Sequence, residues 1–213
     1  MSWGGSRMDD FFDPNGKMME LLWKPIHIMF LNLLWVVFSL PIVTIGASTT
    51  ALYSVLIKMR NGREGKILRN FWDAFRENFR QATIIWLIIL VSAFVFTVDV
   101  AYFLNMGGFF GMFAAMLFVG LDVALVIMCL YVFPMQAVFD NPVAVTIKSA
   151  LFLPARHLGW TALLLALAVL TAVLVALYWP LIGWFVFGLV AYINAWIFDR
   201  IFRRYYKEED VDG

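Results

Sequence analysis

The sequence predicts an all-α protein, a polytopic transmembrane helical bundle of five to six hydrophobic helices with two amphipathic cytoplasmic helices. Hydrophobic residues make up 63% of the 213-residue chain and charged residues only 15%, whereas soluble domains typically contain about 45–50% and 25%. The uncharged residues form runs long enough to cross a bilayer, and the basic residues gather between these runs. We expect residues 1–213 to form a single integral membrane domain.

The first uncharged run, residues 25–57, is interrupted in its middle by Pro41, Thr44 and Gly46. As one straight helix it would extend about 50 Å, although the hydrocarbon core of a bilayer is roughly 30 Å thick. We therefore expect one segment that ends near Leu40 and a shorter one over residues 47–59. The break at residues 41–46 turns within or across the membrane, or the run crosses only once.

The later runs predict four spans. Residues 82–104 and 107–133 are separated by almost no loop, so they form a tight antiparallel hairpin. Residues 158–198 would extend about 60 Å as one helix, so they contain two spans. Pro180 and Gly183 place the turn between these spans at residues 178–183.

Basic residues predict the orientation of the spans. They crowd the connection at residues 58–80, mark a second one with Lys148 and Arg156, and recur in the C-terminal tail at residues 200–207. The connections at residues 105–106 and 178–183 carry no charge. The positive-inside rule makes the basic segments and the C-terminus cytoplasmic. We expect a cytoplasmic N-terminus and six helices, because Lys17 and Lys24 lie close to the first span; a single crossing would give five helices and an external N-terminus.

Each of two cytoplasmic connections predicts an amphipathic helix that runs straight into a span. In residues 67–80, Phe71, Phe75 and Phe79 share one face, and residues 143–157 repeat the pattern. The stripe expected there consists of Ile147, Leu151 and Ala155. An internal duplication of residues 61–133 and 138–198 would explain the similarity. Two interfacial helices of separate origin would explain it equally well.

Two carboxyl groups lie inside predicted spans, where ionisable residues are costly and usually functional. Asp99 lies close to the external turn, so we expect it to be solvated, whereas Asp122 lies nearer the middle of the bilayer. No Lys or Arg lies in any predicted span to pair with Asp122. Asp122 is therefore either a neutral carboxyl group that is hydrogen-bonded to a neighbouring helix or a site that couples transport to a proton or cation.

The remaining polar candidates are the amides Asn32 and Asn194 and the helix break itself. Amides within spans usually form hydrogen bonds between helices. The break at Pro41, Thr44 and Gly46 resembles the interrupted helices of transporters. It is also consistent with a purely structural kink whose backbone groups bond nearby hydroxyl groups.

The sequence offers no sign of an enzyme, metal, cofactor or nucleic-acid site. His27 and His157 have no second ligand at metal-binding spacing. A Walker-type glycine-rich loop, His-Glu-x-x-His and Gly-x-Ser-x-Gly are all missing from the sequence. We therefore expect no enzyme activity and no cofactor, and the lipid bilayer is the first expected partner.

Three sequence blocks resemble the YesL family of uncharacterised bacterial membrane proteins. The first, residues 31–53, contains Leu-Pro-Ile-Val-Thr-Ile-Gly-Ala around the break; the others are residues 71–83 and, more weakly, residues 133–151. The resemblance implies a bacterial cell membrane location and a link to carbohydrate uptake or utilisation, because such proteins are commonly encoded beside carbohydrate transporters and glycan-degrading enzymes.

Two functions from different classes are consistent with these features. The first is a non-enzymatic accessory or regulatory protein that works with a carbohydrate transporter or sensor subunit. The second is a small secondary transporter for a sugar-related or ionic solute, which would use Asp122 and the break at residues 41–46.

Overall fold

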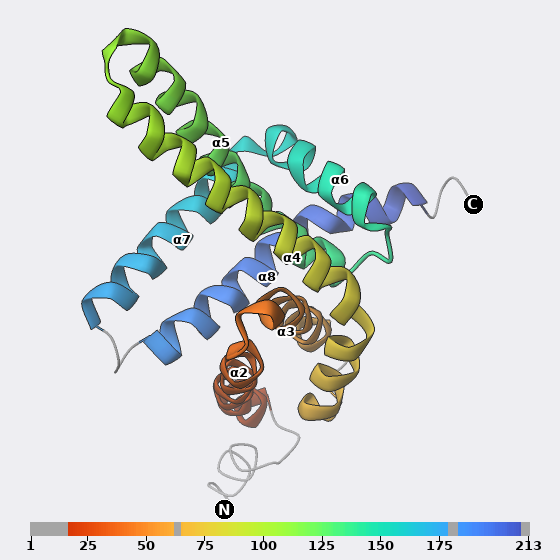
Figure 1. Cartoon of the computed structure of the whole chain (residues 1–213). Coiled ribbons are helices and arrows are strands. Elements are labelled where there is room, and N and C mark those ends of the chain that lie inside the picture. The colour runs from red at the N-terminus through yellow and green to blue at the C-terminus, as the bar shows by residue number, and fades with distance from the viewer. Residues whose placement is uncertain (1–16, 62–64, 179–182, 210–213) are drawn as a thin grey trace, which may run out of the picture.

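The computed structural model describes residues 17–61, 65–178 and 183–209, with side chains described over residues 24–61, 65–177 and 188–202. These residues form helices and, within these ranges, no strand, which confirms the predicted all-α class. The elements in chain order are α2 (Lys17–Ser39), the short 3₁₀ helix η1 (Ile42–Thr44), α3 (Ile45–Arg60), α4 (Ile67–Met106), α5 (Gly108–Gln136), α6 (Val143–Arg156), α7 (Leu158–Tyr178) and α8 (Gly183–Glu209) (Figure 1). The predicted turn at residues 178–183 lies largely outside the described residues.

Four of the described helical segments are long and apolar enough to cross a membrane: Ile42–Arg60, which is η1 with α3, and the helices α4, α5 and α7. They differ sharply in burial. In the most apolar part of α4, α5 and α7 only 11%, 17% and 17% of the residues are buried, against 61% in the segment containing α3. The first three therefore present apolar surface to a bilayer, whereas α3 lies inside the protein.

Helices α4 and α5 form the predicted tight hairpin. Gly107 and Gly108 join them with φ angles of +67° and +70°, a backbone conformation that side chains with a Cβ rarely adopt. A Cβ on Gly111 would lie 2.6 Å from the carbonyl oxygen of Phe103, so the two helices are in close contact beside the turn. Figure 1 shows that the tip of this hairpin projects away from the other helices.

The first amphipathic segment is continuous with the span that follows it, as predicted. Both belong to α4, which bends between its amphipathic and apolar parts (Figure 1). Phe71 and Phe75 are buried and their rings contact Phe38 of α2, with centroids 5.5 and 5.1 Å apart. Phe79 was predicted to share their buried face but remains 41% exposed.

The predicted inner stripe of the second amphipathic helix is wrong by one position. Helix α6 buries Thr146, Ala150 and Leu153, while Leu151 and Ala155 are exposed and Ile147 is only partly buried. Thr146 and Ala150 are small, and α6 contacts α5; we attribute the shift to these side chains, which allow a close approach. The helix also ends at His157 before α7 begins, so it does not continue into the span as the first one does.

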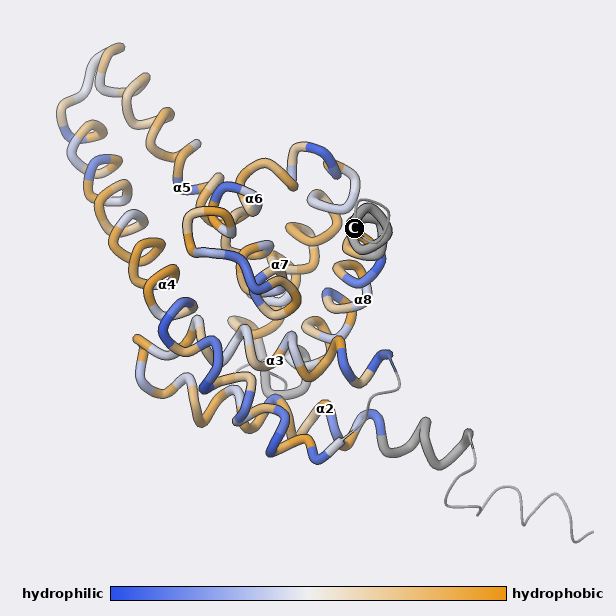
Figure 2. Tube along the Cα trace, turned by 90° about the vertical axis from the view of Figure 1, so that its right-hand side faces the viewer, coloured by the Kyte–Doolittle hydropathy of each residue, from blue (hydrophilic) through white to orange (hydrophobic). Residues whose placement is uncertain are grey.

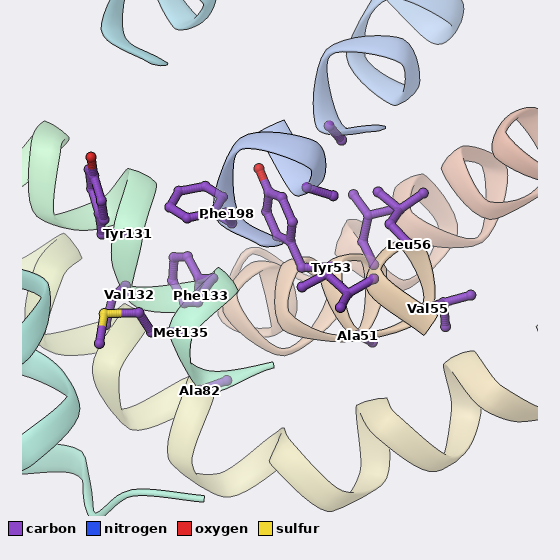
Figure 3. Close-up of a cluster of buried hydrophobic side chains, with 14 of the residues drawn as sticks. Ala51, Tyr53, Val55, Leu56, Ala82, Tyr131, Val132, Phe133, Met135 and Phe198 are labelled. Atoms are coloured by element: carbon purple, nitrogen blue, oxygen red, sulfur yellow. The ribbon is translucent and has the colours of Figure 1, made fainter. Parts of the chain in front are cut away.

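Helix α3 lies at the centre of the core (Figure 3). Tyr53 contacts the ring of Phe198 of α8 edge-on at 6.0 Å, and Phe198 contacts Tyr131 of α5 in the same way at 5.2 Å. The Tyr131 hydroxyl group shares a 2.7 Å hydrogen bond with Thr161 of α7. These contacts connect α3 to three of the other helices.

Candidate functional site

The helix break at residues 41–46 is closed by local hydrogen bonds. The Thr44 hydroxyl group lies 2.6 Å from the carbonyl oxygen of Phe38 and 2.7 Å from that of Pro41. The indole Nε1 of Trp86, on α4, donates a 2.8 Å hydrogen bond to the carbonyl oxygen of Ile42. Carbonyl groups that the break frees thus have protein partners, which favours a structural kink over a backbone exposed for a ligand.

Gly46 brings α3 into direct contact with α4 and α5. A Cβ at this position would lie 2.6 Å from the carbonyl oxygen of Ala82 and 2.7 Å from the Cβ of Trp86. It would also lie 3.0 Å from the ring of Phe133 on α5. Position 46 therefore requires glycine, because α3, α4 and α5 approach one another too closely there to leave room for a side chain.

The two amides singled out in the sequence, Asn32 and Asn194, lie between helices. Asn32 is 2% exposed and packs against Gly188 of α8, where an added Cβ would lie 3.2 Å from the Cβ of Asn32. Asn194 is 6% exposed, and its side chain forms a hydrogen bond with Tyr53 of α3. Both amides therefore join α8 to the first two helices, α2 and α3.

Asp99 and Asp122 lie on the facing sides of the α4–α5 hairpin, each partly buried. The ring of Phe118 on α5 contacts the rings of Phe96 and Phe103 on α4, with centroids 6.0 and 5.6 Å apart. Within the described part of the chain, neither carboxyl group has a hydrogen bond or an ion pair.

A buried ion pair between α3 and α8 was not predicted from the sequence. Arg60 Nε lies 3.2 Å from Asp199 Oδ2, and the two side chains are 22% and 6% exposed. The guanidinium carbons of Arg60 and Arg200 lie 5.7 and 5.5 Å from the ring centre of Trp196. The available signal was Asp199 itself, the only acid between the last apolar run and the basic tail.

The two ends of α3 lie far from the other ends of its neighbouring helices: Gly46 from the tip of the α4–α5 hairpin, and Arg60 from the start of α8. Gly46 contacts Trp86, which is about 30 Å along α4 from Met106 at the hairpin tip. Arg60 pairs with Asp199, which is about 24 Å along α8 from Gly183. In Figure 1 the view runs nearly along α3, whereas α4, α5, α7 and α8 run across it. Helix α3 therefore runs across α4, α5 and α8, and it contacts all three.

The described residues contain no group of three or more His, Cys, Asp or Glu side chains that could hold a metal ion. The polar side chains singled out in the sequence thus fall into three separate places. Asn32 and Asn194 lie beside α8, the break lies against α4, and the two carboxyl groups lie in the hairpin.

The apolar composition and the exposed apolar helices define the class: a polytopic α-helical membrane protein. Residues 28–100 match the family described as "Protein of unknown function, DUF624". This stretch covers about a third of the chain and includes the break, α3 and most of α4. Neither a curated protein nor a solved structure matches the chain.

Proposed function

We propose that the chain is a non-enzymatic accessory or regulatory protein of the bacterial cell membrane that binds a carbohydrate transporter or sensor subunit through its α4–α5 hairpin. The observation that carries this proposal is the apolar surface that the hairpin projects away from the other helices (Figure 1).

The hairpin surface is large, apolar and rich in aromatic residues. Its most exposed side chains are 60–91% exposed in this chain alone: Phe94, Tyr102, Met106, Phe109, Phe110, Met112, Phe113 and Met116. Figure 2 shows hydrophobic residues along most of α5 and along the part of α4 that pairs with it. Aromatic residues and Met are enriched in protein interfaces.

The spacing of the polar groups favours an accessory protein over a transporter. A coupling site built from Asp122 and the break would require the two to lie together. Phe133, which contacts the Gly46 position, is about 16 Å from Asp122 along α5. The break also has its carbonyl groups bonded by Thr44 and Trp86. The link to carbohydrate uptake is supported by the resemblance of residues 31–53 and 71–83 described above.

The positions of α2 and α3 favour a particular topology. Four helices, α4, α5, α7 and α8, cross the bilayer, and α2 and α3 form a hairpin inserted from the cytoplasmic side. Both ends of α3 contact those parts of α4, α5 and α8 that lie next to the basic connections. The Trp35 indole donates a 3.1 Å hydrogen bond to Thr49, which holds α2 beside α3. Both termini are then cytoplasmic.

Single cysteines test this topology when they are introduced into a variant in which Cys129 has been replaced by alanine. We expect Met106→Cys, at the exposed hairpin tip, to react with a membrane-impermeant maleimide added to intact cells. Ser6→Cys and Asp140→Cys are expected to react only after the membrane has been permeabilised. External labelling of Ser6→Cys would contradict the inserted hairpin and would support a single crossing by the first run.

Affinity capture of the full-length protein from native membranes tests the function. We expect a carbohydrate transporter or sensor subunit to be enriched, and Phe94→Ala with Phe113→Ala to reduce its recovery at least tenfold. The matched control is Leu170→Ala with Leu177→Ala, which removes apolar side chains of α7 that are 50% and 70% exposed. Equal recovery by both variants, or solute uptake into proteoliposomes that Asp122→Asn abolishes, would contradict the proposal.

A further inference from the structure

Residues of α5, α6 and α8 and of the loop after α5 line an open apolar cavity that the proposed function does not use. Its volume of about 520 Å³ falls within the usual range for small-molecule sites. Its apolar walls come from three helices and the loop after α5: Met135, Phe139, Phe152, Leu153 and Phe202. Phe139 and Phe202 form one wall, with their rings edge-on at 5.3 Å.

Three polar side chains lie along the same cavity: Asn141, Ser149 and Arg156. Arg156 is exposed in this chain, so its charge is available to a ligand. A second cavity has a volume of about 340 Å³. It is lined by His157, which follows Arg156 in the chain, and by Trp160, Arg200 and Ile201. Among the described residues, no acidic side chain lines either cavity. Arg156 and Arg200 therefore offer positive charge to an anionic group.

The surroundings of the cavity place it at the boundary between lipid and water. Leu151 and Phe152 of α6 are 51% and 60% exposed, a surface that suits acyl chains rather than water. Arg156, the last residue of α6, and Arg200 of α8 lie in two of the segments that the positive-inside rule makes cytoplasmic. Basic pockets between transmembrane helices on this side commonly bind lipid head groups.

We propose that this cavity binds one anionic phospholipid of the cytoplasmic leaflet. The first part of an acyl chain lies against Phe139, Phe152 and Phe202. The phosphate group lies beside Arg156, where the side chains of Asn141 and Ser149 can donate hydrogen bonds. A soluble anion would use only the polar edge of the cavity, whereas a phospholipid uses both the polar edge and the apolar walls.

Native mass spectrometry of the full-length protein in neutral detergent, titrated with dioleoyl phosphatidylglycerol or dioleoyl phosphatidylcholine, tests the proposal. We expect one phosphatidylglycerol molecule to bind at least tenfold more tightly than phosphatidylcholine. Arg156→Gln is expected to remove most of this preference. Ala155→Trp, which fills the cavity from α6, is expected to weaken the binding of both lipids.

Two variants serve as matched controls, because they carry the same types of substitution, Arg to Gln and Ala to Trp, at positions away from the cavity. Arg69→Gln removes a charge from an exposed side chain of α4, and Ala144→Trp enlarges an exposed residue of α6 that does not line the cavity. Both should bind phosphatidylglycerol as tightly as the unchanged protein does. Only variants with the thermal stability of the unchanged protein are compared. Equal affinity for the two lipids, equal losses in Arg156→Gln and Arg69→Gln, or full displacement of the lipid by millimolar inorganic phosphate would overturn the proposal.

Discussion

Replacing Gly46 by alanine is expected to destabilise the protein by about 1–3 kcal/mol, the usual range for an extra methyl group in a well-packed core. The added Cβ would lie 2.6 Å from a backbone oxygen of α4 and 2.7 Å from the Cβ of Trp86. Neither atom is the end of a flexible side chain, so α3 must move away from α4. The free energy of unfolding of the purified protein in detergent, followed by near-ultraviolet circular dichroism, measures the effect.

Gly120→Ala is the matched control, since Gly120 is also in a membrane helix but has open space around it. Alanine favours helices over glycine by up to about 1 kcal/mol, so this variant should be unchanged or slightly more stable. A Gly46→Ala protein as stable as Gly120→Ala would show that α3 does not pack against α4 as described.

Replacing Asp199 by alanine is expected to cost about 3–5 kcal/mol, because it leaves the buried Arg60 guanidinium group without its partner. The two side chains are only 22% and 6% exposed, so water replaces the lost carboxylate poorly. We expect the double variant Arg60→Met with Asp199→Leu to recover most of this loss, since buried ion pairs can often be replaced by apolar residues at little cost. Chemical unfolding in detergent compares the three proteins.

The control for this prediction is the exposed ion pair between Arg69 and Asp73. Arg69 Nε lies 3.7 Å from Asp73 Oδ2, and the two residues are one helical turn apart. Their side chains are 78% and 63% exposed. Asp73→Ala should change stability by no more than about 0.5 kcal/mol. If Asp199→Ala were equally mild, the contact between the ends of α3 and α8 would not be part of the folded protein.

Hydropathy and turn residues predicted the individual helices well. The length of residues 25–57 required a break, and η1 lies at the expected place between α2 and α3. The short loop before Gly107 required a tight hairpin, which α4 and α5 form. These features depend on local sequence, because the length of a helix and the conformation of a glycine are set by neighbouring residues.

The tertiary arrangement could not be read from the same pattern. The segment containing α3 and the helix α7 are both long and apolar enough to cross a membrane, with mean hydropathies of 1.4 and 2.5. Length and composition alone did not show that α3 lies inside the protein. The stripe on α6 was shifted by one position because the small side chains of Thr146 and Ala150 allow a close approach to α5, which hydropathy does not reveal. The ion pair of Arg60 with Asp199 joins residues far apart in the chain, and only the contact between α3 and α8 reveals it.

Site-specific photocrosslinking in native membranes tests the central claim, that the projecting hairpin binds a membrane partner. A photoreactive amino acid is placed at Phe110 on the hairpin, and at Leu170 on α7 as the control. These side chains are 66% and 50% exposed in this chain. We predict a discrete adduct from position 110 that contains a carbohydrate transporter or sensor subunit, and none from position 170. Adducts with lipid alone, or with a second copy of this chain alone, would contradict the claim.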